Sequence, residues 1–292
     1  MVITQCRHLN SGRAILNIPQ EHTQRVKSAW MLSSLVFLLS CSAPVATLSP
    51  ASRHQPALLT TQSTESCSEP GSKIPQVYKA PGHKPGSKEP WVFFLGNAAH
   101  EAITHVYGVY HPANTVYYNS VGIRDIVRRE RIGDDSRLLE NERKLRPDIT
   151  DVTDRVLFEL KPDNTEGLQE GRVQAKQYLA ALNRTIVSGD GFMGGTDFQG
   201  AILLQFQRGL RVWRLEWHTP EPGVTLYRWK RSPSRHDTPK EAYLARQWEE
   251  LPEEELKRYT PMAEQIIKTV ASGQELPKDS HAKFYLVARH CP

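Results

Sequence analysis

The fold of this chain is decided by the stretch Arg146-Pro147-Asp148-Ile149-Thr150-Asp151-Val152-Thr153-Asp154-Arg155-Val156-Leu157-Phe158-Glu159-Leu160-Lys161-Pro162. Its second arm is rich in the apolar and β-branched residues that suit strands, and the Asp-Val-Thr-Asp segment before that arm fits the turn of a β-hairpin. Side chains alternate between the two faces of a strand, so Glu159 and Lys161 point one way while Phe158 and Leu160 point into a core. We therefore predict a hairpin that presents an acid next to an ammonium group.

Asp148, on the first arm, supplies a second carboxylate beside this pair. Two carboxylates suit a hard divalent cation such as Mg²⁺, which keeps several waters when it binds to a protein. Lys161 could orient one of those waters or stabilise negative charge on a phosphate. Glu-x-Lys is also common on exposed strands as a weak surface salt bridge. The apolar neighbours of Glu159 favour a central strand instead, where a charge needs a reason to be buried.

Two helical patterns flank the hairpin. Residues 170–183 repeat apolar side chains at helical spacing, and Gln174 and Tyr178, four residues apart, share one face of that helix. Residues 96–103 begin another helix, which places His100 one turn into it. The hairpin is thus expected to lie between two helices that carry polar groups.

The ordered set of motifs resembles the PD-(D/E)xK nuclease superfamily, in particular its RecB-like branch. The motifs are Gly96-x-x-x-His100, Pro147-Asp148, Glu159-x-Lys161 and Gln174-x-x-x-Tyr178. The tighter strings Arg-Pro-Asp-Ile-Thr-Asp, Phe-Glu-Leu-Lys-Pro and Gln-x-x-x-Tyr-Leu-x-x-Leu-Asn are similar to nuclease domains of bacterial polymorphic toxins. The resemblance covers roughly residues 91–230. It implies an α/β fold with a restriction-endonuclease-like core, in which helices flank a mixed β-sheet.

The resemblance also implies a metal centre for Mg²⁺ or Mn²⁺. Asp148 and Glu159 would bind the ion, and the backbone carbonyl of Leu160 would be a further ligand. His100 would be an additional ligand, as in RecB-like enzymes. Asp151 stays a rival of Asp148 for the first acid, because a shift of one residue in the hairpin register exchanges the faces of the strand.

Other residues are expected to act on the substrate. By resemblance, Lys161 would assist the attacking water, while Gln174 and Tyr178 would brace the site or touch DNA phosphates. Arg124 and Arg128 are one helical turn apart and could line a groove that follows a phosphate backbone. The alternative for these arginines is a solvated helix face that nearby acids partly neutralise.

Composition supports a polyanionic partner without requiring one. The chain has 292 residues, a net charge of +5 and a pI near 9.0, a balance that fits nucleic acid. Its 20 prolines and mean hydropathy of -0.51 indicate one sizeable domain with extensions that are not all packed.

Residues 31–41 form an apolar run that ends at Cys41. A bilayer span needs about 20 apolar residues, so this run fits the hydrophobic region of a signal peptide better. Leu38-Leu39-Ser40-Cys41 resembles a bacterial lipobox, in which Cys41 would carry a lipid. We therefore expect residues 1–41 to be a leader. A translation start at Val26 is one explanation of the leader's unusual length. We expect the mature protein to be an exported, membrane-anchored lipoprotein, periplasmic or at the cell surface. The alternative is a buried helix of a globular domain.

The remaining segments follow from composition. Residues 42–90 are dominated by Pro, Ser, Thr, Gly and Lys and are expected to form a flexible, disordered tether. The nuclease-like domain is expected over residues 91–230, opening with an apolar lead over 91–96. A C-terminal helical extension is expected over residues 231–292, where 239–272 has the pattern of surface helices and 284–288 could add a strand.

The predicted function is a metal-dependent nuclease that hydrolyses phosphodiester bonds, with DNA as the polymer by resemblance. Export fits a toxin-like or scavenging nuclease, and a toxin would have an immunity protein as a partner. One alternative is a catalytically inactive, lipid-anchored binding or structural protein, against which the intact Asp148, Glu159 and Lys161 argue. Another is a cytoplasmic repair nuclease with a misread leader. Cys67 and Cys291 would either form a disulfide or remain two free thiols.

Overall fold

A computed structural model describes residues 57–59 and 90–287 of the chain. The predicted leader, almost all of the predicted tether, the lipidation site Cys41 and the cysteines Cys67 and Cys291 lie outside the described residues. Within the described ranges, none of the helices has both the length and the apolar character needed to cross a bilayer.

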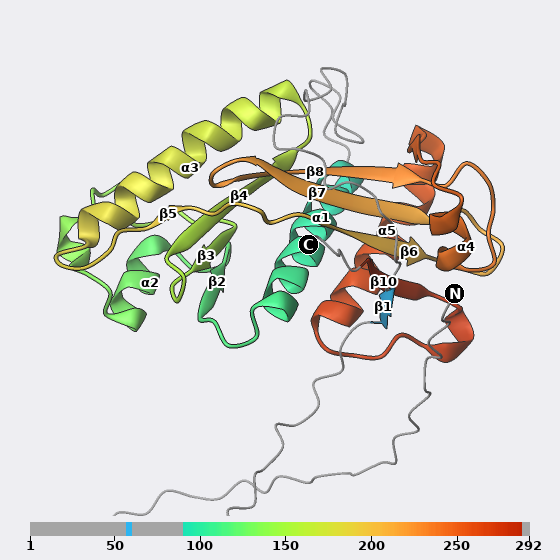
Figure 1. Ribbon diagram of the computed structural model, residues 1–292, viewed down its shortest axis with the longest axis horizontal. Helices are drawn as coiled ribbons and strands as arrows, with labels where there is room; N and C mark the ends of the chain where they lie inside the picture. The colour runs from blue at the N-terminus through green and yellow to red at the C-terminus, as the bar shows by residue number, and fades with distance from the viewer. Residues whose placement is uncertain (1–56, 60–89, 288–292) are drawn as a thin grey trace, which may run out of the picture. The chain divides into compact units, whose positions relative to one another are not determined.

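The described residues form a ten-stranded mixed sheet with the order β1-β10-β6-β7-β8-β4-β3-β2, in which β5 also pairs with β4 and β9 with β8 (Figure 1). Most neighbours are antiparallel, but β4 runs parallel to β8 and to β5, and β1 runs parallel to β10. The strands are β1 (Ala57–Leu59), β2 (Val116–Tyr118), β3 (Ile149–Asp151), β4 (Val156–Pro162), β5 (Met193–Gly194), β6 (Gly200–Gln205), β7 (Trp213–Glu221), β8 (Val224–Arg231), β9 (Glu249–Glu250) and β10 (Lys283–Val287).

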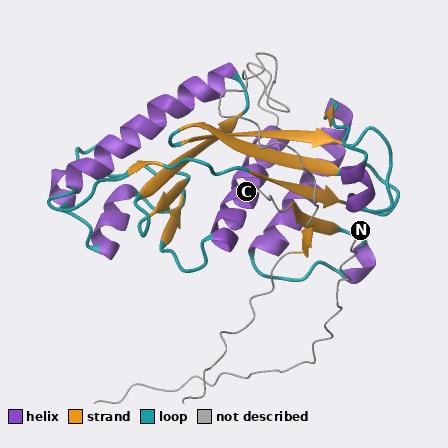
Figure 2. Cartoon of the chain, in the orientation of Figure 1, coloured by secondary structure: helices purple, strands orange, loops and turns teal. Residues whose placement is uncertain are grey.

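Helices cover both faces of this sheet (Figure 2). The helices are α1 (Pro90–Tyr110), α2 (Ile123–Glu130), α3 (Thr165–Thr185), α4 (Pro239–Leu244) and α5 (Glu253–Ala271), with short 3₁₀ turns at η1 (Asp135–Arg137) and η2 (Lys278–Ser280). α1 packs against α5, whereas α3 packs on β4 and β8. The predicted fold class, an α/β core whose mixed sheet is flanked by helices, is confirmed.

The predicted hairpin is formed by β3 and β4, and β4 is an interior strand between β3 and β8. Phe158 and Leu160 are buried in the core shared with α1 and α5, whereas Leu157 is buried in the core under α3. Because strand side chains alternate, Glu159 and Lys161 lie on the α3 side of the sheet. Burying an aromatic or aliphatic side chain of this size contributes about 1.5–3 kcal/mol, which fixes the register that places the two charges.

Glycine allows α3 to approach this part of the sheet closely. A Cβ on Gly171 would lie 2.6 Å from Val224 Cγ1 and 3.4 Å from Lys161 Cγ. At the start of the helix, the side chain of Asn164 accepts a hydrogen bond from the N–H of Gly167 at 2.6 Å and caps the first turn. α3 therefore packs directly over the side chain of Lys161.

Several element boundaries differ from the sequence predictions. The predicted apolar lead over 91–96 is already helical, because α1 begins at Pro90. α3 continues past Asn183, whose side chain instead accepts from the N–H of Phe192 at 2.6 Å and donates to its carbonyl at 2.9 Å. In the described part of residues 231–292, β10 overlaps the strand expected over 284–288 and pairs with β6, whereas β9 pairs with β8 and was not expected.

Candidate metal centre and active site

Asp148 lies immediately before β3 and is buried, with 6% of its surface exposed. Its Oδ2 accepts a hydrogen bond from the backbone N–H of Leu160 at 2.8 Å, and its Oδ1 lies 3.1 Å from Nδ1 of His100. The first contact comes from β4 and the second from α1. The side chain is thus held at the point where β3 begins, between two elements far apart in the sequence.

Glu159 and Lys161 form the second half of the site. Glu159 is 3% exposed, and its Oε1 lies 2.8 Å from Nζ of the half-buried Lys161. Its other carboxylate oxygen, Oε2, is buried and has no hydrogen-bond partner. A buried carboxylate oxygen without a donor is energetically costly, so this atom is suited to receive a cation or a donor.

The two acids differ in proton affinity. Burial acts to raise the pKa of Asp148, but the charge and hydrogen bond of His100, the N–H of Leu160 and the charge of Lys161 outweigh it and hold that pKa below its ordinary value. Burial, followed by the negative charge of Asp148, raises the pKa of Glu159 to about 7. Environments that separate the pKa values of neighbouring acids are typical of functional sites.

Leu160 presents its backbone to the same place. The N–H and C=O of one residue point to the same edge of a strand, and the N–H of Leu160 donates to Asp148. The carbonyl of Leu160 therefore faces the side of β4 on which Asp148 lies. The structure brings this predicted ligand next to the predicted metal acid.

Two tyrosine side chains lie near the acids. The ring of His100 packs edge to face on Tyr227, with centroids 5.7 Å apart. Burial and the charge of Asp148 raise the pKa of Tyr227, and burial followed by the charges of Glu159 and Asp148 raises the pKa of Tyr178. Both hydroxyls therefore stay protonated and can donate hydrogen bonds. Gln174 lies half-buried on α3, one turn before Tyr178.

Tyr227 is the member of this group that sequence reasoning missed. It lies on β8, 66 residues beyond Lys161 in the chain (227 − 161). Within the sequence it is one aromatic residue in an alternating strand, so its position beside His100 and Asp148 follows only from the parallel pairing of β8 with β4.

The donor set fits a hard divalent cation. Asp148, Glu159 and the Leu160 carbonyl supply oxygen atoms, which Mg²⁺ and Mn²⁺ prefer, and the unpartnered Oε2 of Glu159 is available for one. His100 uses Nδ1 toward Asp148, so Nε2 is the nitrogen that could reach an ion. Glu159 could therefore offer Oε2 to an ion while its Oε1 stays in contact with Lys161.

A different group of potential ligands lies at the turn of the hairpin. One ligand atom each from His111, Asp151 and Asp154 lie within 4.8 Å of one another. Asp151, the rival first acid, is fully buried there, and its Oδ2 accepts from the Tyr107 hydroxyl at 3.0 Å and from Asn114 Nδ2 at 2.7 Å.

The amide of Asn114 also donates to Asp154 Oδ2 at 2.7 Å, and the N–H of Asp154 donates to Asp151 Oδ1 at 3.0 Å. Donors from the protein thus already occupy the space between the two carboxylates. We interpret Asp151 as the residue that holds the turn, whereas Asp148 is the acid that lies with His100, Glu159 and Lys161.

The two predicted backbone-binding arginines lie on α2 as expected. The structure shows that both face acids: Arg124 Nε is 3.8 Å from Asp125, and Arg128 Nε is 2.7 Å from Asp135. Exposed pairs of this kind are worth little energy and can exchange partners, but they lower the charge that the helix presents to a polyanion.

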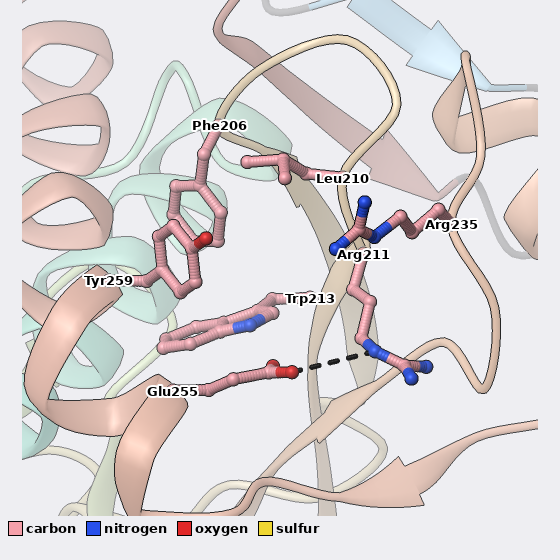
Figure 3. A pocket seen from close by; sticks show the side chains of 7 residues that line it. All are labelled: Phe206, Leu210, Arg211, Trp213, Arg235, Glu255 and Tyr259. Atoms are coloured by element: carbon pink, nitrogen blue, oxygen red, sulfur yellow. Dashed lines mark ion pairs between the residues drawn. The ribbon is translucent and has the colours of Figure 1, made fainter.

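A hollow elsewhere in the fold contains none of the predicted site residues. Phe206, Tyr259 and Trp213 form its aromatic wall, with Phe206 and Tyr259 stacked 5.2 Å apart (Figure 3). Arg211 lies at its rim, with Nε 3.5 Å from Glu255 Oε1. This hollow lies where β7 begins, on the α5 side of the sheet, and plays no part in the site around Asp148.

Comparison with known proteins supports the same region. Residues 128–197 match the model of a protein family described as restriction endonuclease fold toxin 9. The matched segment contains the hairpin and α3, and with them Asp148, Glu159 and Lys161, whereas His100 precedes it. The resemblance predicted from the sequence is confirmed, and the family indicates a nuclease toxin. Comparisons with curated proteins and with solved structures found no match.

Proposed function

We propose that this protein is a divalent-metal-dependent nuclease toxin that hydrolyses phosphodiester bonds in DNA. The observation that carries the proposal is the meeting of Asp148, Glu159 and Lys161 in one buried site, with the Oε2 atom of Glu159 lacking a hydrogen-bond donor. The family match over residues 128–197 supports the reaction class. Mg²⁺ and Mn²⁺ are the proposed ions.

Each residue has a distinct task in this proposal. Asp148, oriented by His100 and by the N–H of Leu160, and Glu159 hold the ion together with the Leu160 carbonyl. A bound divalent cation lowers the pKa of a coordinated water and offsets negative charge on the phosphate. Lys161, held beside Glu159, would supply a positive charge next to the attacked phosphorus.

Side chains from α3 complete the site. Tyr178 stays protonated beside two acids, so its hydroxyl can donate to a phosphate oxygen or to an acid. Gln174 carries an amide on the same helical face and can donate in the same way. We propose that both residues orient the acids and the substrate rather than transfer protons.

The experiment that tests the proposal uses the full chain on plasmid DNA, linear DNA and RNA, with Mg²⁺, Mn²⁺ or EDTA. Wild type should cleave DNA only with a metal, and Lys161→Ala should reduce the rate by about 100-fold or more, as expected when a group that stabilises transition-state charge is removed. Lys176→Ala, an exposed lysine of α3, is the matched control and should cleave normally. Absence of cleavage by folded wild type would overturn the proposal.

We further propose that the enzyme is exported and anchored through a lipid on Cys41. The proposed chain divides into a leader over residues 1–41, a tether over 42–90, the nuclease-like domain over 91–230 and an extension over 231–292. The support is the apolar run before Cys41 and its likeness to a lipobox. The producing cell would then need a neutralising immunity protein. Membrane fractionation of wild type and Cys41→Ser tests the anchor, because the variant should move to the soluble fraction.

A further inference from the structure

We infer that Lys144 and Arg146 bind the phosphate backbone of the nucleic acid beside the scissile bond. The inference rests on the proposed nuclease function and assigns its substrate-binding edge. Both residues are exposed, and both lie in the segment that leads into the buried Pro147-Asp148 pair.

Five of the cations in residues 121–146 differ in their ion pairs. Three arginines are paired with carboxylates: Arg124 with Asp125 at 3.8 Å, Arg128 with Asp135 at 2.7 Å and Arg143 with Glu140 at 2.7 Å. Within residues 90–287, Lys144 and Arg146 have no carboxylate within ion-pair distance. Their charges are therefore available to an outside anion, whereas those of the paired arginines are partly neutralised.

The backbone that carries these two cations is fixed near Asp148. The N–H of Ile123, in the first turn of α2, donates to the carbonyl of Leu145 at 2.9 Å. Gly122 lies so close that a Cβ there would be 3.2 Å from the carbonyl of Arg143. Arg146 precedes Asp148 by two residues, a separation of about 7 Å at most between their Cα atoms. The length of the arginine side chain spans that separation.

Charge balance explains why cations are needed at this position. The site holds two acids, Asp148 and Glu159, and a polynucleotide adds further negative charge on either side of the attacked phosphate. Lys161 is engaged with Glu159, so it does not neutralise those flanking phosphates. Exposed Lys and Arg that contact phosphates supply sequence-independent affinity through release of counterions.

The test measures binding and cleavage by the full chain. Binding of a labelled short DNA duplex is followed by fluorescence anisotropy in EDTA, where no metal-dependent cleavage occurs, over about 50–200 mM salt. For Lys144→Gln combined with Arg146→Gln, the slope of log K against log salt should become shallower by about 1.8, which is two contacts of about 0.9 each. In Mg²⁺, KM should rise while kcat stays within about two-fold, since uniform binding is lost.

Two further double variants serve as controls. Lys240→Gln with Lys278→Gln removes the same charge from exposed positions on α4 and η2, and should leave the slope unchanged. Lys144→Arg with Arg146→Lys keeps both charges and should retain most of the slope, which separates loss of charge from misfolding.

An unchanged salt slope in the neutral variant at Lys144 and Arg146, or an equal change in the control at Lys240 and Lys278, would overturn the inference. A wild type that binds DNA with the expected slope but cleaves neither DNA nor RNA would instead overturn the proposed reaction and leave the binding edge in place. The two failures are therefore distinguishable in one set of measurements.

Discussion

Replacement of Glu159 by Gln should remove a pH-dependent loss of stability from the metal-free protein. The environment raises the pKa of Glu159 from 4.5 to about 7, mainly through burial and then through the charge of Asp148. A carboxyl with a raised pKa binds its proton more tightly in the folded chain. Its stabilising contribution is therefore complete below about pH 4.5 and is lost as the pH rises through about 7.

The size of the effect follows from the difference between the ordinary pKa of 4.5 and the raised pKa of about 7. At 1.36 kcal/mol per unit this corresponds to about 3 kcal/mol, of which roughly 2–3 kcal/mol should be lost between about pH 5 and 8. Because Glu159 is only 3% exposed, solvent screening reduces this figure little.

Urea unfolding in EDTA at these two pH values gives the measurement. Glu159→Gln has no proton to lose, so between the two pH values its free energy of unfolding should fall by roughly 2–3 kcal/mol less than that of wild type. Glu166→Gln, an exposed glutamate in the first turn of α3, is the control and should behave as wild type.

Excess Mg²⁺ should restore the stability of wild type at pH 8 but not that of Glu159→Gln, because the ion binds the folded state through that carboxylate. Parallel pH dependence of wild type and Glu159→Gln in EDTA would refute the reasoning. The buried carboxylate would then not be destabilised in the way the geometry indicates.

Four other substitutions test separate parts of the fold and site. Asp148→Asn should abolish metal binding in a calorimetric titration. Asp151→Asn should keep metal binding and lower the free energy of unfolding by about 1–3 kcal/mol, because it disturbs the donors around the hairpin turn. The reverse pattern would identify Asp151 as the metal acid. Gly171→Ala should lower the free energy of unfolding in urea by about 1–3 kcal/mol and slow cleavage, because a Cβ would meet Val224 at 2.6 Å and crowd Lys161. An unchanged stability would contradict the close approach of α3. Asn164→Ala should lower the free energy of unfolding by about 1 kcal/mol through loss of the helix cap, while cleavage is retained. A loss of cleavage at unchanged stability would disagree with a capping role.

The sequence by itself determined the local elements and the chemistry of the motif residues. The alternation of side chains along a strand predicted that Glu159 and Lys161 share one face and that the other face lies in the core. This two-residue period is a property of any strand. Helical spacing likewise placed Gln174 and Tyr178 on one face of α3. The ordered motifs predicted the nuclease family that the match over residues 128–197 supports.

Boundaries were less well predicted, since the ends of elements depend on packing partners. The helix before the hairpin begins at Pro90, and its apolar residues from Leu95 onward pack in the core shared with the sheet and α5. Asn183 has a good C-terminal signal, yet its side chain binds the backbone of Phe192 and the helix continues to Thr185. Tertiary contacts of this kind outweigh local propensity.

Only the tertiary structure distinguishes the surroundings of Asp148 from those of Asp151. Both are acids of one short arm, but Asp148 meets the N–H of Leu160 and the ring of His100, whereas Asp151 is enclosed by donors at the turn. The structure alone also brought Tyr227 to the site and separated the paired arginines from Lys144 and Arg146. Such outcomes depend on which distant elements lie side by side, a property of strand pairing and helix packing that no local pattern in the sequence contains.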